Sequence, residues 1–155
     1  RVKTIHVTSA LEMYQAALSE TENCQLFIAS AAVADYRPAR VAEQKMKKTA
    51  DQMTIELVKN PDIVSAVAAL QNRPFTVGFA AETTQVEDFA RSKLERKKLD
   101  LVIANDVSDR TIGFNSDDNA VLVVEMQGAE AIPKINKSIL ARQLIAKIAD
   151  MLPTD

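Results

Sequence analysis

The order of apolar segments constrains the fold of this chain more than any other feature. Short apolar runs, typical of buried strands, alternate with longer stretches whose apolar residues recur at helical spacing. Such alternation predicts an α/β domain of the Rossmann-like type, with an open, mostly parallel sheet and helices on both faces. We expect strands at 2–7, 26–29, 53–58, 75–81, 99–104 and 120–125, with Ile132 in a last strand, and helices at 10–19, from 61 onward, 86–98 and 135–151.

The starts of two helices can be predicted from their capping residues. Ser9 precedes the first helix and is a good N-cap. Asn60 is the expected N-cap of the second helix, because Pro61 suits the first helical position. Asp62 adds negative charge to that first turn, where the helix dipole favours it.

Composition excludes several classes of protein. The 155 residues suit one domain, 1–155, and 47% hydrophobic with 26% charged residues is ordinary for a soluble globular chain. A net charge of −2 gives no general attraction to nucleic acid or to an anionic membrane, and no apolar run approaches the roughly 18 residues of a membrane span. The single Cys24 and single His6 exclude a disulfide and a zinc site. We expect Cys24 to be buried and the protein to be cytoplasmic.

The segment 37–52 shows no apolar periodicity and is the longest irregular stretch of the sequence. Long loops in compact domains often cover binding sites, so this segment is expected to be a flexible lid. It carries Lys45, Lys47 and Lys48, which could close over a polyphosphate.

Polar side chains follow three of the expected strands. They are Asp35, Glu82 and the pair at 105–106. In an open α/β sheet, ligands bind beyond the carboxyl ends of the strands. A carboxylate with nearby lysines there suits a phosphate-bearing substrate, and Asp35 could hold Mg²⁺ together with substrate phosphates. Ordinary solvated charges on a surface loop are the alternative interpretation.

Two lysines on the third helix form a second candidate anion site. Lys93 and Lys97 are four residues apart and therefore share a helical face, where they repel each other unless an anion lies between them. A solvated basic face is the alternative. The sequence contains neither a GxGxxG motif nor a P-loop, so lysines and the helix start near Asp62 would have to hold a nucleotide. The polar segment 113–119 is interpreted mainly as a structural turn that could also reach the site.

Six segments, in this order, resemble phosphopantothenate–cysteine ligase, the ligase domain at the C-terminal end of the bacterial bifunctional coenzyme A biosynthesis protein. They are Ala31–Tyr36, Lys45–Lys48, Leu57–Val64, Gly78–Thr83, Ala104–Val107 and Gly113–Asp117. Each segment alone is a weak signal, but together they are specific and cover nearly the whole chain.

The resemblance implies a reaction and its participants. The family uses CTP to activate the carboxylate of 4′-phosphopantothenate as an acyl-cytidylate, releasing pyrophosphate. The amine of L-cysteine then attacks, which gives phosphopantothenoylcysteine and CMP. Mg²⁺ is required, the fold is a ribokinase-like ligase domain, and the domain is a homodimer whose site lies near the dimer interface.

The resemblance also assigns roles to residues. Lys45 would be catalytic, stabilising charge as the acyl-cytidylate forms, and Asp35, the candidate Mg²⁺ ligand named above, would contact the nucleotide. Ala31 and Ala32 would let the backbone approach phosphopantothenate closely. The nucleotide-binding positions would be Asp35, Lys45, Pro61, Asp62, Ile63, Val64, Phe79, Lys93 and Lys97.

The sequence departs from the family pattern at its N-terminal side. Family members carry an upstream segment with an asparagine for turnover and an arginine for phosphopantothenate, and nothing similar occurs here. We therefore expect this chain to be the C-terminal portion of the ligase domain, with its N-terminal part and the upstream flavin-dependent decarboxylase domain missing, and so with no flavin. Two alternatives remain: a nucleotide-binding or dimerisation fragment without turnover of its own, and an unrelated dinucleotide-binding oxidoreductase, which the missing GxGxxG disfavours.

Overall fold

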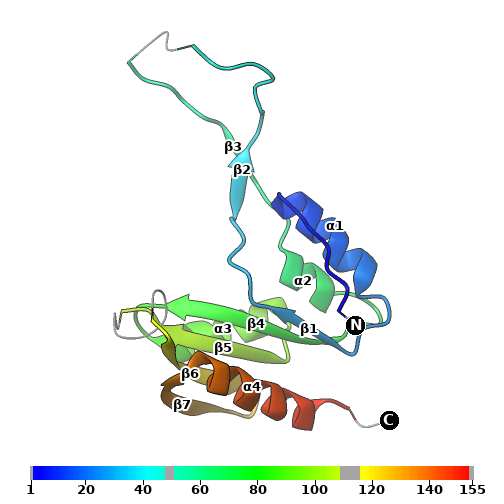
Figure 1. The fold of residues 1–155 in the computed structure, drawn as a ribbon, viewed down its shortest axis with the longest axis vertical. Coiled ribbons are helices and arrows are strands. Elements are labelled where there is room, and N and C mark those ends of the chain that lie inside the picture. The colour runs from blue at the N-terminus through cyan, green and yellow to red at the C-terminus, as the bar shows by residue number, and fades with distance from the viewer. Residues whose placement is uncertain (1, 48–50, 109–115, 154–155) are drawn as a thin grey trace.

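A five-stranded sheet forms the centre of the molecule (Figure 1). The computed structural model describes residues 2–47, 51–108 and 116–153. The strands of this sheet are β1 (Leu26–Ala29), β4 (Phe75–Glu82), β5 (Leu101–Asp106), β6 (Asp118–Glu125) and β7 (Gly128–Asn136), in that spatial order. β1, β4 and β5 run parallel, whereas β6 and β7 continue the sheet as antiparallel strands. The predicted Rossmann-like α/β class is confirmed.

Four helices accompany the strands in the described ranges. They are α1 (Ala10–Glu20), α2 (Ile63–Ala68), α3 (Val86–Lys97) and α4 (Lys137–Met151). As predicted, Ser9 caps α1, because its side chain accepts a hydrogen bond from the backbone N–H of Glu12. The carboxylate of Glu12 in turn accepts hydrogen bonds from the backbone N–H and the hydroxyl of Thr8. The first turn of α1 is therefore bonded to both residues that precede the helix.

The core has two halves, one on each face of the sheet. On one face, Leu94 of α3 packs with Val102 of β5 and the small residues around them. On the other face, Leu140, Leu144 and Ile148 of α4 pack on the opposite side chains of β4, β5 and β6. Alternate residues of β5 therefore pack in different halves of the core, which explains why all four residues from 101 to 104 are buried.

Both ends of α3 have left-handed backbone conformations at residues that are not glycine. Gln85 at the N-cap has φ 46°, and Lys98 at the C-cap has φ 55°. The N–H of Leu99 bonds the carbonyl of Leu94, which closes the helix end and directs the chain into β5.

A long excursion, here called the arm (residues 36–59), leaves the body between β1 and α2 (Figure 1). Its base is a two-stranded antiparallel ribbon of β2 (Tyr36–Pro38) and β3 (Leu57–Lys59), in which Tyr36 pairs with Lys59. Beyond the ribbon, the described residues run as an irregular segment that extends away from the sheet. Of the segment 37–52 that was expected to be irregular, residues 37–38 belong to β2, residues 39–47 and 51–52 form no helix or strand, and 48–50 lie outside the described residues.

Several local predictions are wrong. Residues 2–7 form no strand: Figure 1 shows this segment beside α1, and it pairs with none of the described strands. The strand expected at 53–58 is reduced to β3, since only its end meets β2. Cys24 is exposed, because it lies in the turn after α1, where its thiol donates to the carbonyl of Glu20.

The cap of α2 also differs from the prediction. Asp62 is the N-cap, and its Oδ1 accepts the N–H of Ser65 at 3.1 Å. Asn60 cannot serve, because its side chain already bonds the carbonyl of Ala34 and the guanidinium of Arg37. Pro61 consequently lies before the helix and not at its first position.

Candidate functional site

An open cavity of about 1400 Å³ lies beyond the carboxyl ends of β1 and β4. Its walls come from the loop after β1, the start of α2, one side of α3 and the N-terminal segment. Every site residue predicted from the sequence lines this cavity except Lys45. These residues are Ala31, Ala32, Asp35, Pro61, Asp62, Ile63, Val64, Phe79, Lys93 and Lys97.

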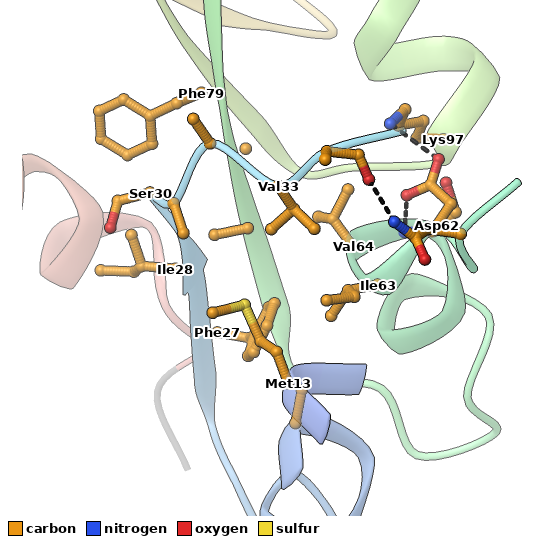
Figure 2. Close-up of a pocket in the computed structure, with 18 of the residues that line it drawn as sticks. Met13, Phe27, Ile28, Ser30, Val33, Asp62, Ile63, Val64, Phe79 and Lys97 are labelled. Carbon is orange, nitrogen blue, oxygen red and sulfur yellow. Dashed lines mark hydrogen bonds and ion pairs between the residues drawn. The ribbon is translucent and has the colours of Figure 1, made fainter. Parts of the chain in front are cut away.

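The cavity is polar on one side and apolar on the other. Figure 2 shows the pair of Asp62 and Lys97 on one side, with Met13 and Phe27 lower in the cleft. Ile63 lies between these two regions. The site can therefore accommodate a ligand with a charged end and an apolar or aromatic part.

The loop after β1 supplies one wall. Ala31 and Ala32 are exposed and line the cavity, and their small side chains leave the backbone there accessible. Asp35 is also exposed on this wall. Its own carbonyl accepts the N–H of Asn60 at 2.8 Å, which fixes the loop against the chain that leads into α2.

The start of α2 supplies the facing wall. Asp62 stands at the N-cap, Ile63 is buried beneath it, and Val64 packs against the α3 side of the core. Partial burial favours the neutral form of Asp62, but hydrogen bonds from Lys97 and from the Ser65 N–H outweigh it and lower the pKa of this carboxyl. Asp62 therefore remains an anion at neutral pH.

The two lysines of α3 are held by different protein groups. Nζ of Lys97 lies 2.8 Å from Oδ2 of Asp62, and Nζ of Lys93 donates to the carbonyl oxygen of Phe79. The carboxylate of Asp62 thus provides the negative charge that relieves repulsion between the lysines. The alternative of a freely solvated basic face is wrong, since both side chains are partly buried.

Burial lowers the pKa of Lys93, and the nearby positive charge of Lys97 lowers it further. Glu82 and Asp62 act in the opposite direction. A ligand phosphate placed between the two lysines would offset this penalty, because it would bring negative charge to both ammonium groups. The arrangement is therefore suited to an anionic ligand.

The structure does not bring Lys45 to the cavity. It is exposed on the arm, as are the other described residues from 41 to 47, and Lys48 lies outside the described residues. Glu82 and Asp106 occupy paired positions on β4 and β5, yet neither lines the cavity. Of the expected polar strand ends, Asp35 and Asn105 reach it.

Other lining residues were not singled out from the sequence. Arg96 follows Lys93 by one helical turn, so its position on the same side of α3 could have been predicted. Lys3, Lys59 and Lys137 also line the cavity. They come from distant segments of the chain, so no local sequence pattern predicts their position. Asn119, from the polar segment 113–119, reaches the cavity as well, whereas 113–115 lie outside the described residues.

Within the described ranges, no group of three or more His, Cys, Asp and Glu side chains could hold a metal ion. A single carboxylate such as Asp35 remains compatible with Mg²⁺ when substrate phosphates supply the other ligands. Among the same residues, no helix combines the length and the apolar character required to cross a membrane.

The family model for the C-terminal domain of the DNA/pantothenate metabolism flavoprotein matches residues 1–152. The chain belongs to this family, called the DFP family below. The resemblance inferred from the six sequence segments is thereby confirmed, and family membership gives no support to a dinucleotide-binding oxidoreductase.

The relatives of the chain are consistent with its DFP membership. It is 54% identical over 154 residues to the coenzyme A biosynthesis bifunctional protein CoaBC of Vibrio vulnificus strain CMCP6, covering 97% of this chain and 38% of the relative. The corresponding figures for Escherichia coli K12 CoaBC are 50% over 151 residues, 95% and 37%. The chain thus spans less than two fifths of the length of these relatives.

Solved structures show the same fold. The crystal structure of the C-terminal domain of CoaBC superposes with a TM-score of 0.77 at 32% identity, covering 97% of this chain and 66% of the solved chain. A DNA/pantothenate metabolism flavoprotein from Streptococcus pneumoniae gives a TM-score of 0.76 at 23% identity, which supports the fold alone.

Proposed function

We propose that this chain is the nucleotide-binding part of a phosphopantothenate–cysteine ligase of coenzyme A biosynthesis. In this reaction CTP activates the carboxylate of 4′-phosphopantothenate as an acyl-cytidylate and pyrophosphate leaves. The amine of L-cysteine then attacks the activated carbonyl, giving phosphopantothenoylcysteine and CMP. The names of the CoaBC relatives support the pathway, and the site supports the binding of a nucleotide.

One observation carries the proposal. The positions that the ligase resemblance assigns to nucleotide and substrate come from five separate stretches of sequence, and all of them except Lys45 line one cavity. That cavity lies where ligands bind in open α/β sheets. Unrelated surface residues would not be expected to converge in this way.

The site suggests a role for each wall. Lys93 and Lys97 would hold the phosphates, with Phe79 beside the nucleotide. When the nucleotide binds, it would replace part of the contact between Asp62 and Lys97. The exposed carboxylate of Asp35 would hold Mg²⁺ together with phosphate oxygens, and the ion would neutralise charge that develops as pyrophosphate leaves. Ala31 and Ala32 would admit phosphopantothenate.

Lys45 would act through the arm. In the ligase assignment its ammonium group stabilises charge during acyl-cytidylate formation, so the arm must bring it to a cavity of the same chain or of a second copy. The arm displays exposed apolar side chains, including Val41, Met46 and Ile55. A homodimer would cover part of that surface, since exposed apolar clusters often mark interfaces.

Nucleotide binding by this chain tests the proposal. With Mg²⁺ present, CTP should raise the melting temperature more than ATP does, and the variants Lys93→Ala and Lys97→Ala should lose that difference. Lys134→Ala removes an exposed lysine of β7 outside the cavity and is the matched control. Equal shifts with both nucleotides, or no shift with either, would contradict the proposal.

A nucleotide-binding fragment without turnover is the second candidate. It is favoured by the position of Lys45 away from the cavity and by the 66% coverage of the solved CoaBC domain. Pyrophosphate release, measured with phosphopantothenate, CTP and Mg²⁺, separates the two. Release at a rate well above that of Lys45→Ala supports the complete ligase, whereas binding of CTP without release supports the fragment.

The remaining expectations follow the relatives. A decarboxylase domain upstream, which the ligase resemblance implies, and a cytoplasmic location are part of the proposal. The dimer can be tested by sedimentation velocity. The wild-type chain should sediment as a dimer, and Val41→Asp with Ile55→Asp should shift it to a monomer. A monomer at all concentrations would contradict the expected dimer.

A further inference from the structure

Asn60 is a buried polar residue at the junction of two walls of the cavity. Its side chain is only 7% exposed, and it stands directly before Pro61 and the cap of α2. Its Nδ2 donates to the carbonyl of Ala34 at 2.8 Å, and its backbone N–H donates to the carbonyl of Asp35 at 2.8 Å. Two hydrogen bonds from one residue therefore hold the loop after β1.

Arg37 fixes the orientation of this amide. Its Nη1 donates to the Oδ1 of Asn60 at 3.0 Å and to the carbonyl of Lys59 at 2.9 Å. Because Arg37 can only donate, Oδ1 must face it, and Nδ2 must therefore face Ala34. Asn60 and Arg37 together are called the clamp below.

The clamp joins parts of the chain that are far apart in sequence. The bond between Asn60 and Ala34 spans 26 residues, and the intervening chain is the arm. On one side of the clamp lies Asp35, and on the other lies Asp62, which pairs with Lys97. The spacing of these two acidic groups across the cavity therefore depends on the clamp and not on the part of the arm beyond its two-stranded base.

We propose that Asn60, oriented by Arg37, is a positioning residue that sets the distance between the Asp35 wall and the α2 wall. The clamp thereby determines the affinity of the cavity for a nucleoside triphosphate with its metal ion. This inference rests on the proposed function, because the ligand is the one proposed there.

Only an amide meets both requirements at position 60. An aspartate in its place would keep an acceptor for Arg37 but would oppose the carbonyl of Ala34 with a second oxygen. An alanine would leave that carbonyl without its partner. In both cases the loop after β1 loses one of its two attachments while the core of the sheet is unchanged.

The experiment compares Asn60→Asp with wild type and two controls. Asn72→Asp makes the same chemical change at an exposed turn, and Ile148→Ala destabilises the α4 side of the core, away from the cavity. Calorimetric titration with CTP and Mg²⁺, well below the melting temperature, should give an affinity about tenfold weaker for Asn60→Asp. The affinity falls because the hydrogen bond from Asn60 to the carbonyl of Ala34 is lost and the loop after β1 is no longer held in place. Both controls should bind as wild type does.

A second measurement needs no nucleotide. In amide NMR spectra, the signals of Asp35 and Ser65 should both shift in Asn60→Asp, because the two walls move relative to each other, and neither should shift in Asn72→Asp. If wild type fails to bind CTP, the proposed function is wrong, and these signals alone decide for or against the clamp. If Asn60→Asp does not fold, Arg37→Lys replaces it with the same two readouts. Unchanged affinity or unchanged Asp35 and Ser65 signals in a folded variant overturn the inference.

Discussion

Gly78 shows how a single missing side chain permits the central packing. A Cβ atom at this position of β4 would lie 2.7 Å from Cδ1 of Leu99, which is itself buried. We predict that Gly78→Ala lowers the free energy of unfolding by about 1–3 kcal/mol through overpacking. Urea denaturation checks this value. Adding Leu99→Val should restore part of the loss, and a strictly additive double variant would show that the clash is not the cause.

The charge of Asp62 predicts a dependence of stability on pH. The pKa of this carboxyl is lowered in the folded state, where the bonds from Lys97 and Ser65 outweigh the effect of burial. Its contribution to stability is therefore present above the unfolded pKa of about 4 and is lost as the pH falls through the folded pKa. The melting temperature of Asp62→Asn should thus lie below that of wild type at pH 7, and the two should converge toward pH 2.

A matched control separates this effect from general charge repulsion. Asp51→Asn removes an exposed carboxylate on the arm and should follow the wild-type curve between pH 7 and pH 2. If the difference between wild type and Asp62→Asn stays constant over that range, the contact with Lys97 does not contribute through ionisation.

At the residue scale, the sequence was a good guide to the site. The lysines of α3 and the residues from 61 to 64 were found because each lies in a local pattern. Asn60 was assigned the wrong role, since an asparagine before Pro61 looks like a cap when the carbonyl of Ala34 is out of view. Long-range hydrogen bonds of this kind leave no periodic signal in a sequence.

Helix α4 illustrates how one element separates inward from outward positions. Leu144 is 8% exposed and packs on the sheet, whereas its neighbour Ile145 is 53% exposed. We predict that Leu144→Ala costs about 2–5 kcal/mol of unfolding free energy. Ile145→Ala, the matched control, should change it by no more than about 0.5 kcal/mol. Guanidinium denaturation followed by circular dichroism measures both, and similar costs would contradict the assigned faces.

Element boundaries were predictable where a segment meets its partners locally. Helices α1 and α3 end within one residue of the ranges that their periodicity predicts, and α1 also has its predicted cap at Ser9. The alternation of residues 2–7 was misleading, because a strand requires a neighbour and the pattern does not say whether one is present. β3 is shorter than the predicted strand for the same reason, since β2 contributes only three residues to pair with it.

For the whole molecule, the two halves of the core should behave as independent contributors to one unfolding transition. Leu94 packs on one face of the sheet and Leu144 on the other, with β5 between them. We predict that the costs of Leu94→Ala and Leu144→Ala add to within about 0.5 kcal/mol in the double variant. Denaturation of the single and double variants measures the sum. A larger deviation would mean that the sheet transmits strain between its faces.

The fold class was predictable at this scale, but the sheet directions were only partly so. Alternating strands and helices indicate the parallel strands β1, β4 and β5 correctly. β6 and β7 are joined by a tight turn at residues 126–127, and such a short connection leads to antiparallel neighbours. The antiparallel pairing of β6 with β5 has no comparable local signal in the sequence. The outline of the arm could not be predicted, because an irregular segment has no pattern that gives its direction.

The paired residues Tyr36 and Lys59 close the base of the arm, so the chain leaves the body and returns to it at neighbouring positions. A segment whose two ends lie side by side can be lengthened or shortened without displacing any other part of the chain. Each doubling of such a loop adds only about 0.6 kcal/mol of closure entropy. The exposed residues 41–44 of the arm are therefore a natural place to insert a peptide tag or a fluorescent reporter, with the folding of the sheet left unaltered.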